Sequence, residues 1–248
     1  MVMNKAVPGC VPEAVAKGDY FDDQGNHVYF FLQKYHDMDM QSPPDPQELA
    51  VLLADLHSHK SPSGRFGFDV PVAGGILILE NKWEDTWAAQ FTNVLKATID
   101  LDNAANPPWP EYDIVCKQVI DYVIPRLLGA LQSDGRSIDP VLVHMDLWEG
   151  NVARDLETGK LILYDPCCVY AHNEVEFGTW RCSWATHFNS PIYQMFYQRL
   201  IEPSEPVEEF DDRNRLYAAR ASLCDSGGHA GSRSRQMFVL LLPCDRRS

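Results

Sequence analysis

The chain has 248 residues, and its 45% hydrophobic and 23% charged residues are typical of a globular protein with a sizeable core. Its formal net charge of -14 argues against nucleic acid or an anionic membrane surface as the main partner, because clustered Lys and Arg bind phosphate groups. No apolar run reaches the ~18 residues of a membrane span, no signal-peptide pattern is visible, and the seven cysteines show no zinc or disulfide pattern, which favours reduced thiols in a cytoplasmic protein.

The N-terminal 35 residues have the pattern of β-structure. Two strand-like stretches, residues 10–20 and 27–35, are joined by the turn-rich segment DDQGN. A proline-rich segment then interrupts regular structure, and the next helix has a clear start. Asp45 is a candidate N-cap, Pro46 occupies the first helical position, and Glu48 stands three residues after the cap.

The rest of the chain is mainly helical, with short strands in its middle. Large apolar residues recur at helical spacing over 83–95 and again over 108–132, where Pro125 should kink or divide the helix. The segments VLVH and LILYD resemble two short buried strands, with the hairpin-like DLETGK between them. Helical patterns follow, but residues 238–248 show none. Strands, helices, a small hairpin and further helices form an α+β order rather than an alternating βαβ one.

One stretch, VLVHMDLWEGNVARD followed by LILYD, carries the side chains of a phosphotransfer reaction. His144 and Asp146 form a His-x-Asp pattern, Asn151 follows the Asp by five residues, and Asp165 closes the second apolar run. This is the spacing of a kinase catalytic loop, in which a carboxylate orients the attacking hydroxyl and takes its proton. Asp146 is therefore the candidate general base. Asn151 and Asp165 are candidate Mg²⁺ ligands, since a few hard protein oxygens suffice when phosphates and water complete the shell.

Two other interpretations compete with this one. A His-x-Asp pattern alone is more often a chance tripeptide followed by an ordinary turn, but the added spacing to Asp165 favours phosphotransfer. The other interpretation is a metal-dependent hydrolase, but the sequence lacks the dense His cluster of hydrolase motifs such as HExxH. Its ligands would be His144, Asp146, His172 and Glu174.

The segment VHMDLWEGNVARDLETGKLILYDPCCVYAHNEVEFGTWR closely resembles the fructosamine kinase family, also called ketosamine-3-kinases or protein-ribulosamine 3-kinases. Its fungal-type branch is the most similar. The family motif HGDLWxGN falls on His144 to Asn151, and the family pattern D-P-x-x-x-Y-x-H-x-E falls on Asp165 to Glu174. The segments LADLHSHKSPSGRFGFDVP and NKWEDTWAAQF also look like family segments, so the resemblance covers most of residues 8 to 236.

This resemblance implies a two-lobed, protein-kinase-like fold, similar to that of aminoglycoside and choline kinases. It implies phosphorylation, with ATP and Mg²⁺, of the sugar 3-hydroxyl of ketoamines on protein lysines or small amines, which makes the sugar leave. Trp148 would contact the substrate, a core aromatic being the alternative. Gln33 and Tyr35 lie in a segment that resembles the adenine-binding hinge, with an ordinary edge strand as the alternative. His144 would brace the loop by hydrogen bonds, and His172 and Glu174 would hold the segment after Asp165.

The chain departs from the family pattern in two ways that bear on activity. Met145 stands where the family usually has Gly, a residue that often serves a backbone conformation resisted by side chains. Before the hinge segment there is no GxGxxG, and the lysines there are Lys5 and Lys17. A kinase fold normally places a glycine-rich loop and a phosphate-binding Lys in that part.

We therefore expect the chain to begin inside the small lobe. Residues 1–40 would be the remnant of the small lobe and the hinge, 41–236 the helical lobe with the catalytic hairpin, and 237–248 a divergent tail. A catalytically impaired pseudokinase or ligand-binding relative is the alternative to an active ketosamine kinase. Another small-molecule kinase of the same fold is a third possibility, and the DLW and YAHNE signatures argue against it.

Overall fold

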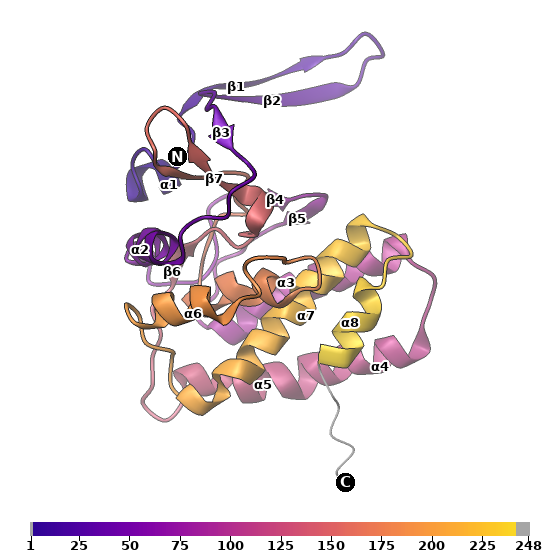
Figure 1. Cartoon of the computed structure of the whole chain (residues 1–248). Helices are drawn as coiled ribbons and strands as arrows, with labels where there is room; N and C mark the ends of the chain where they lie inside the picture. The colour runs from indigo at the N-terminus through magenta and orange to yellow at the C-terminus, as the bar shows by residue number, and fades with distance from the viewer. Residues whose placement is uncertain (1, 242–248) are drawn as a thin grey trace.

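The computed structural model describes residues 2–241. A long two-stranded hairpin projects from one end of the molecule, the long helices fill the other end, and short strands lie between them (Figure 1). The strands are β1 (Ala14–Phe21), β2 (His27–Gln33), β3 (Met38–Asp39), β4 (Val72–Gly74), β5 (Leu77–Leu79), β6 (Val141–Val143), β7 (Val152–Asp155), β8 (Leu161–Leu163) and β9 (Val169–Ala171).

The α-helices are α1 (Val2–Ala6), α2 (Pro46–His57), α3 (Trp87–Ala105), α4 (Pro110–Gln118), α5 (Ile124–Leu127), α6 (Pro191–Gln198), α7 (Phe210–Gly228) and α8 (Ser234–Leu241). A π-helix, η1 (Val119–Val123), separates α4 from α5. Residues 2–241 also contain four 3₁₀ helices: η2 (Gly129–Gln132), η3 (Glu149–Asn151), η4 (Asn173–Arg181) and η5 (Val207–Glu209). No helix within residues 2–241 is long and apolar enough to cross a membrane.

The N-terminal hairpin β1–β2 matches the sequence prediction in most of its length. Its strands pair antiparallel up to Phe21 opposite His27, and Asp22 closes the turn by accepting hydrogen bonds from the backbone N–H groups of Gln24 and Asn26. Both strands leave large apolar side chains exposed. The helix α1, by contrast, was not predicted. Its buried Met3 belongs to the same apolar cluster as residues of α2, so tertiary packing stabilises this short helix.

The helix α2 begins where the sequence indicates. The Asp45 carboxylate accepts hydrogen bonds from the N–H groups of Gln47 and Glu48, and Pro46 follows the cap. Glu48 does not complete a capping box in the expected way. Its carboxylate instead pairs with Arg154 on β7 at 2.6 Å, which ties the start of the helix to the strand that follows the motif loop.

Pro125 divides the third helical segment, as predicted. The helix α4 continues into the π-helix η1 and then into α5, in which Pro125 is an N-terminal residue. A proline lacks an N–H and its ring clashes with the carbonyl of the preceding turn, and a wider turn accommodates both.

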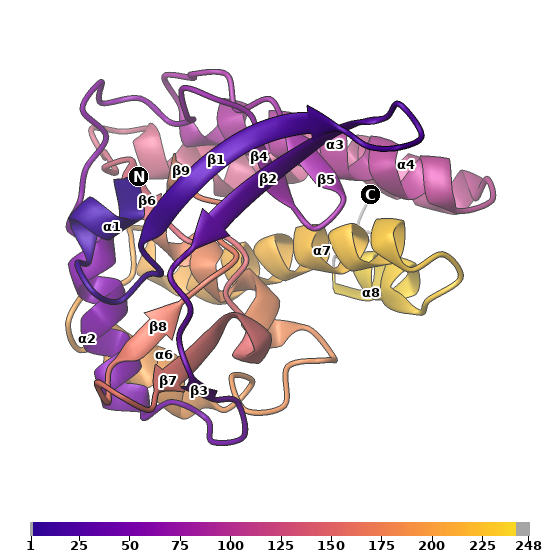
Figure 2. The same ribbon diagram turned by 90° about the horizontal axis from the view of Figure 1, so that it is seen from above.

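The strands around the motif pair differently from the sequence prediction. VLVH, which contains β6, and LILYD, which contains β8, are not partners. The strand β6 pairs antiparallel with β9, while β8 pairs with β7, and β7 also pairs with β3. Figure 2 shows the chain running from the end of β2 to β3, beside β7 and β8. The prediction was wrong because β7, with four residues, and β9, with three, are too short to stand out by periodicity.

Two apolar clusters hold these elements together. One lies among α3, α4, α5, α7 and α8, and it includes β6 and β9; the other joins α1, α2 and α6 to β7 and β8. The helix α8 corrects the expectation of no helix after residue 237. Phe238 on α8 is fully buried against the ring of Tyr112, and the Arg235 guanidinium lies 4.1 Å from the same ring centre. The predicted tail beyond residue 241 lies outside the described residues.

Candidate active site

The motif loop starts at the end of a fully buried strand. β6 delivers His144 and Met145, whose backbone N–H groups donate to the Glu176 carboxylate at 2.7 and 2.9 Å. The ring Nε2 of His144 is hydrogen-bonded to the Tyr164 carbonyl at 2.8 Å, and the N–H of Asp146 donates to Nδ1 of His144 at 3.3 Å. His144 therefore braces the loop, as the sequence analysis expected.

Glu176, on η4, is the anchor of this loop and was missed in the sequence analysis. It is buried, and His57 Nε2 adds a third contact to its carboxylate at 3.3 Å. Burial by itself raises the pKa of Glu176. The hydrogen bond and charge of His57, the charge of His144 and the backbone N–H of His144 lower this pKa by more than burial raises it. The net pKa of Glu176 is therefore below its ordinary value. Glu176 is thus held as an anion in the protein interior.

Met145 has a left-handed backbone conformation, with φ of +63°. This is the region that glycine adopts freely and other residues adopt at a cost. The usual Gly of the family pattern is thus explained by backbone geometry. In this chain the Met145 side chain is 2% exposed and packs in the core, so it occupies space that glycine would leave empty.

The three predicted phosphotransfer residues converge. The amide nitrogen of Asn151 donates to the Asp146 carbonyl at 2.7 Å and to its carboxylate at 3.3 Å. Asp165 follows β8 with φ of +52°, and its carboxylate has no hydrogen-bond or ion-pair partner among residues 2–241. Burial raises the pKa of Asp146, and the positive charge of Arg220 is the largest opposing influence.

A cavity of about 700 Å³ brings most of the predicted site residues together. Asp146, Trp148, Asn151 and Asp165 line one side, and Gln33 at the end of β2 lines another. Its walls also include residues of α1, of β2 and of the loop between β4 and β5. Tyr35 does not join them. It is 83% exposed and is not part of the lining, because the chain leaves β2 two residues earlier.

A second cavity of about 560 Å³ lies on the other side of Asp146. It shares Gly75, Asp146 and Trp148 with the larger one, and α7 contributes much of its wall. Trp148 is 39% exposed, so it is not the core aromatic that the sequence left open. Its ring covers Gly150, where an added Cβ would lie 2.3 Å from the indole, which explains the small residue at this place in the motif.

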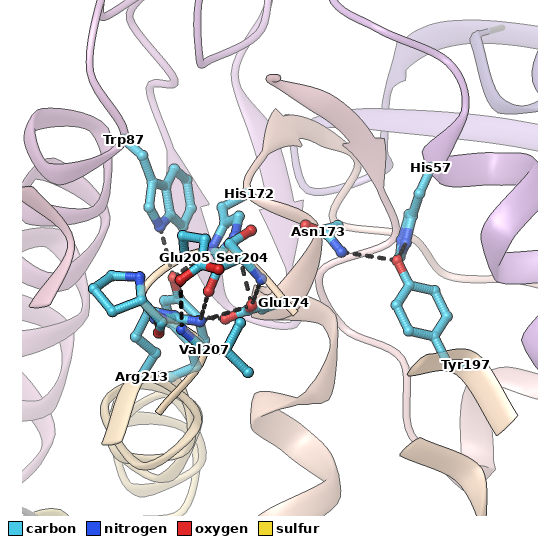
Figure 3. Close-up of polar contacts among 12 residues, drawn as sticks. His57, Trp87, His172, Asn173, Glu174, Tyr197, Ser204, Glu205, Val207 and Arg213 are labelled. Atoms are coloured by element: carbon cyan, nitrogen blue, oxygen red, sulfur yellow. Dashed lines mark hydrogen bonds and ion pairs between the residues drawn. The ribbon is translucent and has the colours of Figure 1, made fainter. Parts of the chain in front are cut away.

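His172 and Glu174 belong to a separate buried polar network that includes Ser204 and Arg213 (Figure 3). His172 is hydrogen-bonded to the Tyr217 and Ser204 hydroxyls, each at 2.9 Å, and Arg213 donates twice to the Glu174 carboxylate. Burial lowers the pKa of His172 to about 4, so its ring is neutral at neutral pH. Within residues 2–241 no group of three His, Cys, Asp or Glu side chains is placed to hold a metal.

Comparison with solved structures defines the class of fold. A protein from Haemophilus somnus named as a fructosamine-3-kinase matches with a TM-score of 0.68 at 17% identity, over 97% of this chain and 74% of that one. An aminoglycoside phosphotransferase matches with a TM-score of 0.59 at 14% identity, over 97% of this chain and 80% of the other. These likenesses confirm the predicted α+β, protein-kinase-like fold.

Sequence comparison then gives the family. The fructosamine kinase family model matches residues 1–232, and the chain belongs to this family. The protein-ribulosamine 3-kinase, chloroplastic, of Oryza sativa subsp. indica is 29% identical over 174 residues, which are 70% of this chain and 46% of the relative. The chain spans about half the length of the curated relatives it matches.

Proposed function

We propose that this chain phosphorylates the sugar 3-hydroxyl of a ketoamine, using ATP and Mg²⁺, and so starts the removal of the sugar from a protein lysine or a small amine. The observation that carries the proposal is the convergence of Asp146, Asn151 and Asp165 on one cavity that Gln33 also lines. Family membership supports the ribulosamine or fructosamine class of substrate. The six cysteines within the described residues are free thiols, in keeping with the proposed cytoplasmic location.

Asp146 is the proposed general base. Its carboxylate is largely buried, and burial raises its pKa, which makes it a better proton acceptor than an exposed carboxylate. The hydrogen bonds that the Asn151 amide donates to the carbonyl and carboxylate of Asp146 hold this side chain in position. Asp146 would orient the acceptor hydroxyl and take its proton as the phosphoryl group is transferred.

Asn151 and Asp165 are the proposed Mg²⁺ ligands, and their chemistry fits that ion. The Asn151 nitrogen is engaged with Asp146, which leaves the amide oxygen for a cation. The Asp165 carboxylate has no partner within residues 2–241. Two protein oxygens are a common complement for Mg²⁺, which neutralises phosphate charge when bound.

Gln33 is the proposed contact on the nucleotide side, and Tyr35 is proposed to act through its backbone alone, since its side chain lies outside the cavity lining. None of the described residues that line the larger cavity is Lys or Arg. This composition is the specific observation that favours the second candidate function, a relative that binds ligand with impaired turnover.

The test is to incubate the purified chain with ATP, Mg²⁺ and a ribulosamine or fructosamine, and to detect the sugar phosphate by mass spectrometry. Asp146→Asn removes the base, and Asp100→Asn, an exposed carboxylate on α3, is the matched control. Turnover that only Asp146→Asn abolishes supports the proposal. Saturable ketoamine binding without turnover supports the impaired relative, and a chain that neither binds nor phosphorylates ketoamines contradicts both.

A further inference from the structure

Arg220, on α7, is a buried cation without a hydrogen-bond or ion-pair partner among residues 2–241. It is 5% exposed, its Nε atom is buried and unbonded, and it lines the smaller cavity beside Asp146. A buried guanidinium carries a large desolvation cost unless an anion or several acceptors face it. The fold itself supplies none within hydrogen-bonding distance, so the missing acceptor is expected from a ligand.

The fold does satisfy another fully buried arginine of the same helix. Arg213 donates to both oxygens of Glu174 and to the carbonyls of Ser204 and Pro206. The contrast with Arg220 is therefore a property of the site rather than of α7. Arg220 points its unsatisfied charge into a cavity, whereas Arg213 points into the protein.

The smaller cavity is placed to receive the acceptor of the reaction. Asn151 and Asp165 line only the larger cavity, whereas Asp146 and Trp148 line both cavities. A nucleotide in the larger cavity would therefore leave the smaller one to the molecule whose hydroxyl Asp146 activates. Its remaining polar lining includes Asp225, whose carboxylate is hydrogen-bonded to His229 Nδ1 at 2.9 Å and to the Ser234 hydroxyl at 2.5 Å. Asp146 and Asp225 are thus the carboxylates that line this cavity together with Arg220.

We propose that Arg220 binds a carboxylate of the acceptor, so that this pocket takes ketoamines formed on the amino group of a free amino acid. This inference rests on the proposed function and names its substrate class. Such a ketoamine carries one secondary ammonium and one carboxylate. The guanidinium matches the carboxylate in a two-bond fork, and the carboxylate of Asp146 suits the ammonium. A phosphate, with its higher negative charge, would meet the carboxylates of Asp146 and Asp225 unfavourably.

A purely structural role for Arg220 would be to offset the charge of Asp146. The two side chains form no ion pair, although the positive charge of Arg220 acts on Asp146 across the cavity. In that role Arg220 would affect a charged and a neutral acceptor alike. Selectivity between the two is therefore the quantity that separates the two roles.

The experiment is calorimetric titration of the full chain with the fructose adduct of glycine and with the isosteric adduct of glycinamide, which lacks the negative charge. We expect the glycine adduct to bind about tenfold or more tightly, because a charge-assisted pair with a buried cation is lost in the amide. Arg220→Met should remove this preference by weakening the glycine adduct alone, and Arg220→Lys should keep part of it. Arg215→Met, which removes a half-exposed arginine of the same helix, should leave the preference intact.

Equal binding of the two adducts to the unaltered chain would overturn the inference while leaving the proposed function in place, as would an Arg220→Met variant that loses both adducts equally. Failure of the unaltered chain to bind either adduct would instead count against the proposed function itself. Circular dichroism of each variant establishes that it is folded. If Arg220→Met does not fold, the comparison of Arg220→Lys with the unaltered chain decides by the same ratio.

Discussion

Exchanging Met145 for Gly and for Ala separates the two opposing effects at this position. The left-handed backbone costs a non-glycine residue about 1–2 kcal/mol, while removal of a buried Met side chain down to Ala costs about 2–5 kcal/mol. Met145 has φ of +63° and is 2% exposed, so both effects apply in full. Both variants should therefore be less stable than the unaltered chain, although Met145→Gly restores the usual residue of the family.

The order of the two variants is the decisive quantity. At an ordinary negative φ, Gly is less stable than Ala by about 0.5–1 kcal/mol because its unfolded chain is more flexible. At Met145 the relief of about 1–2 kcal/mol of strain exceeds this loss. Met145→Gly should thus be more stable than Met145→Ala by roughly 0.5–1 kcal/mol.

The assay is urea unfolding at pH 7, followed by tryptophan fluorescence, with six tryptophans in the chain as reporters. Leu53, in the middle of α2 and fully buried, is the matched control site, where the Gly variant should be the less stable of the pair. If Met145→Ala proves as stable as Met145→Gly, or more so, the strain argument is refuted. A Met145→Gly variant more stable than the unaltered chain would refute the packing argument.

Two further predictions concern buried ionisable groups. Glu176→Gln keeps the side-chain volume but places an NH₂ group, in place of an acceptor oxygen, against the loop N–H groups and His57. The free energy of unfolding, measured in urea, should therefore fall by about 2–4 kcal/mol. An unchanged unfolding midpoint would contradict the anchor role. His172 has a pKa of about 4 in the folded chain, against 6.5 as its ordinary value. Between these pH values the unfolded chain binds more protons than the folded chain. The free energy of unfolding should therefore fall by about 3 kcal/mol as the pH drops from about 6.5 to 4. Unfolding midpoints at several pH values measure this slope, which should be shallower in His172→Gln, and an equal slope in both proteins would rule it out.

The features predicted correctly from the sequence are those whose signals are local. The cap at Asp45 and the break at Pro125 depend on a few neighbouring residues. The spacing of Asp146, Asn151 and Asp165 is likewise written within one short stretch, and the structure brings these three side chains to one cavity. Their catalytic and metal-binding roles stay predictions that the proposed assays test.

The features that were missed depend on contacts between distant segments. β6 pairs with β9 rather than with β8, and nothing in three apolar residues specifies the partner. The helix α8 depends on the burial of Phe238 against Tyr112, more than a hundred residues away. Arg220 similarly looks like an ordinary helical arginine until the cavity beside it is known.

The 3₁₀ helix η4 holds the loop that carries Asp146 on both sides of that residue. The Thr179 hydroxyl and the Trp180 indole N–H both donate to the Leu147 carbonyl, at 2.5 and 2.9 Å, immediately after Asp146 in the chain. Glu176 holds the two residues before it through their backbone N–H groups. None of these partners lies on the β1–β2 hairpin.

That hairpin contributes Phe31 and Gln33 to the larger cavity and forms no hydrogen bond to the loop within the described residues. The position of Asp146 is therefore set independently of the hairpin. The backbone groups of His144, Met145 and Leu147 bond to side chains of η4, and the His144 ring bonds to the Tyr164 carbonyl. A change at Gln33 should consequently raise the KM for nucleotide and leave acceptor binding unaltered, since the smaller cavity has no lining residue from the hairpin. A change at Glu176 should instead lower kcat, because it frees the backbone on which the proposed base is mounted.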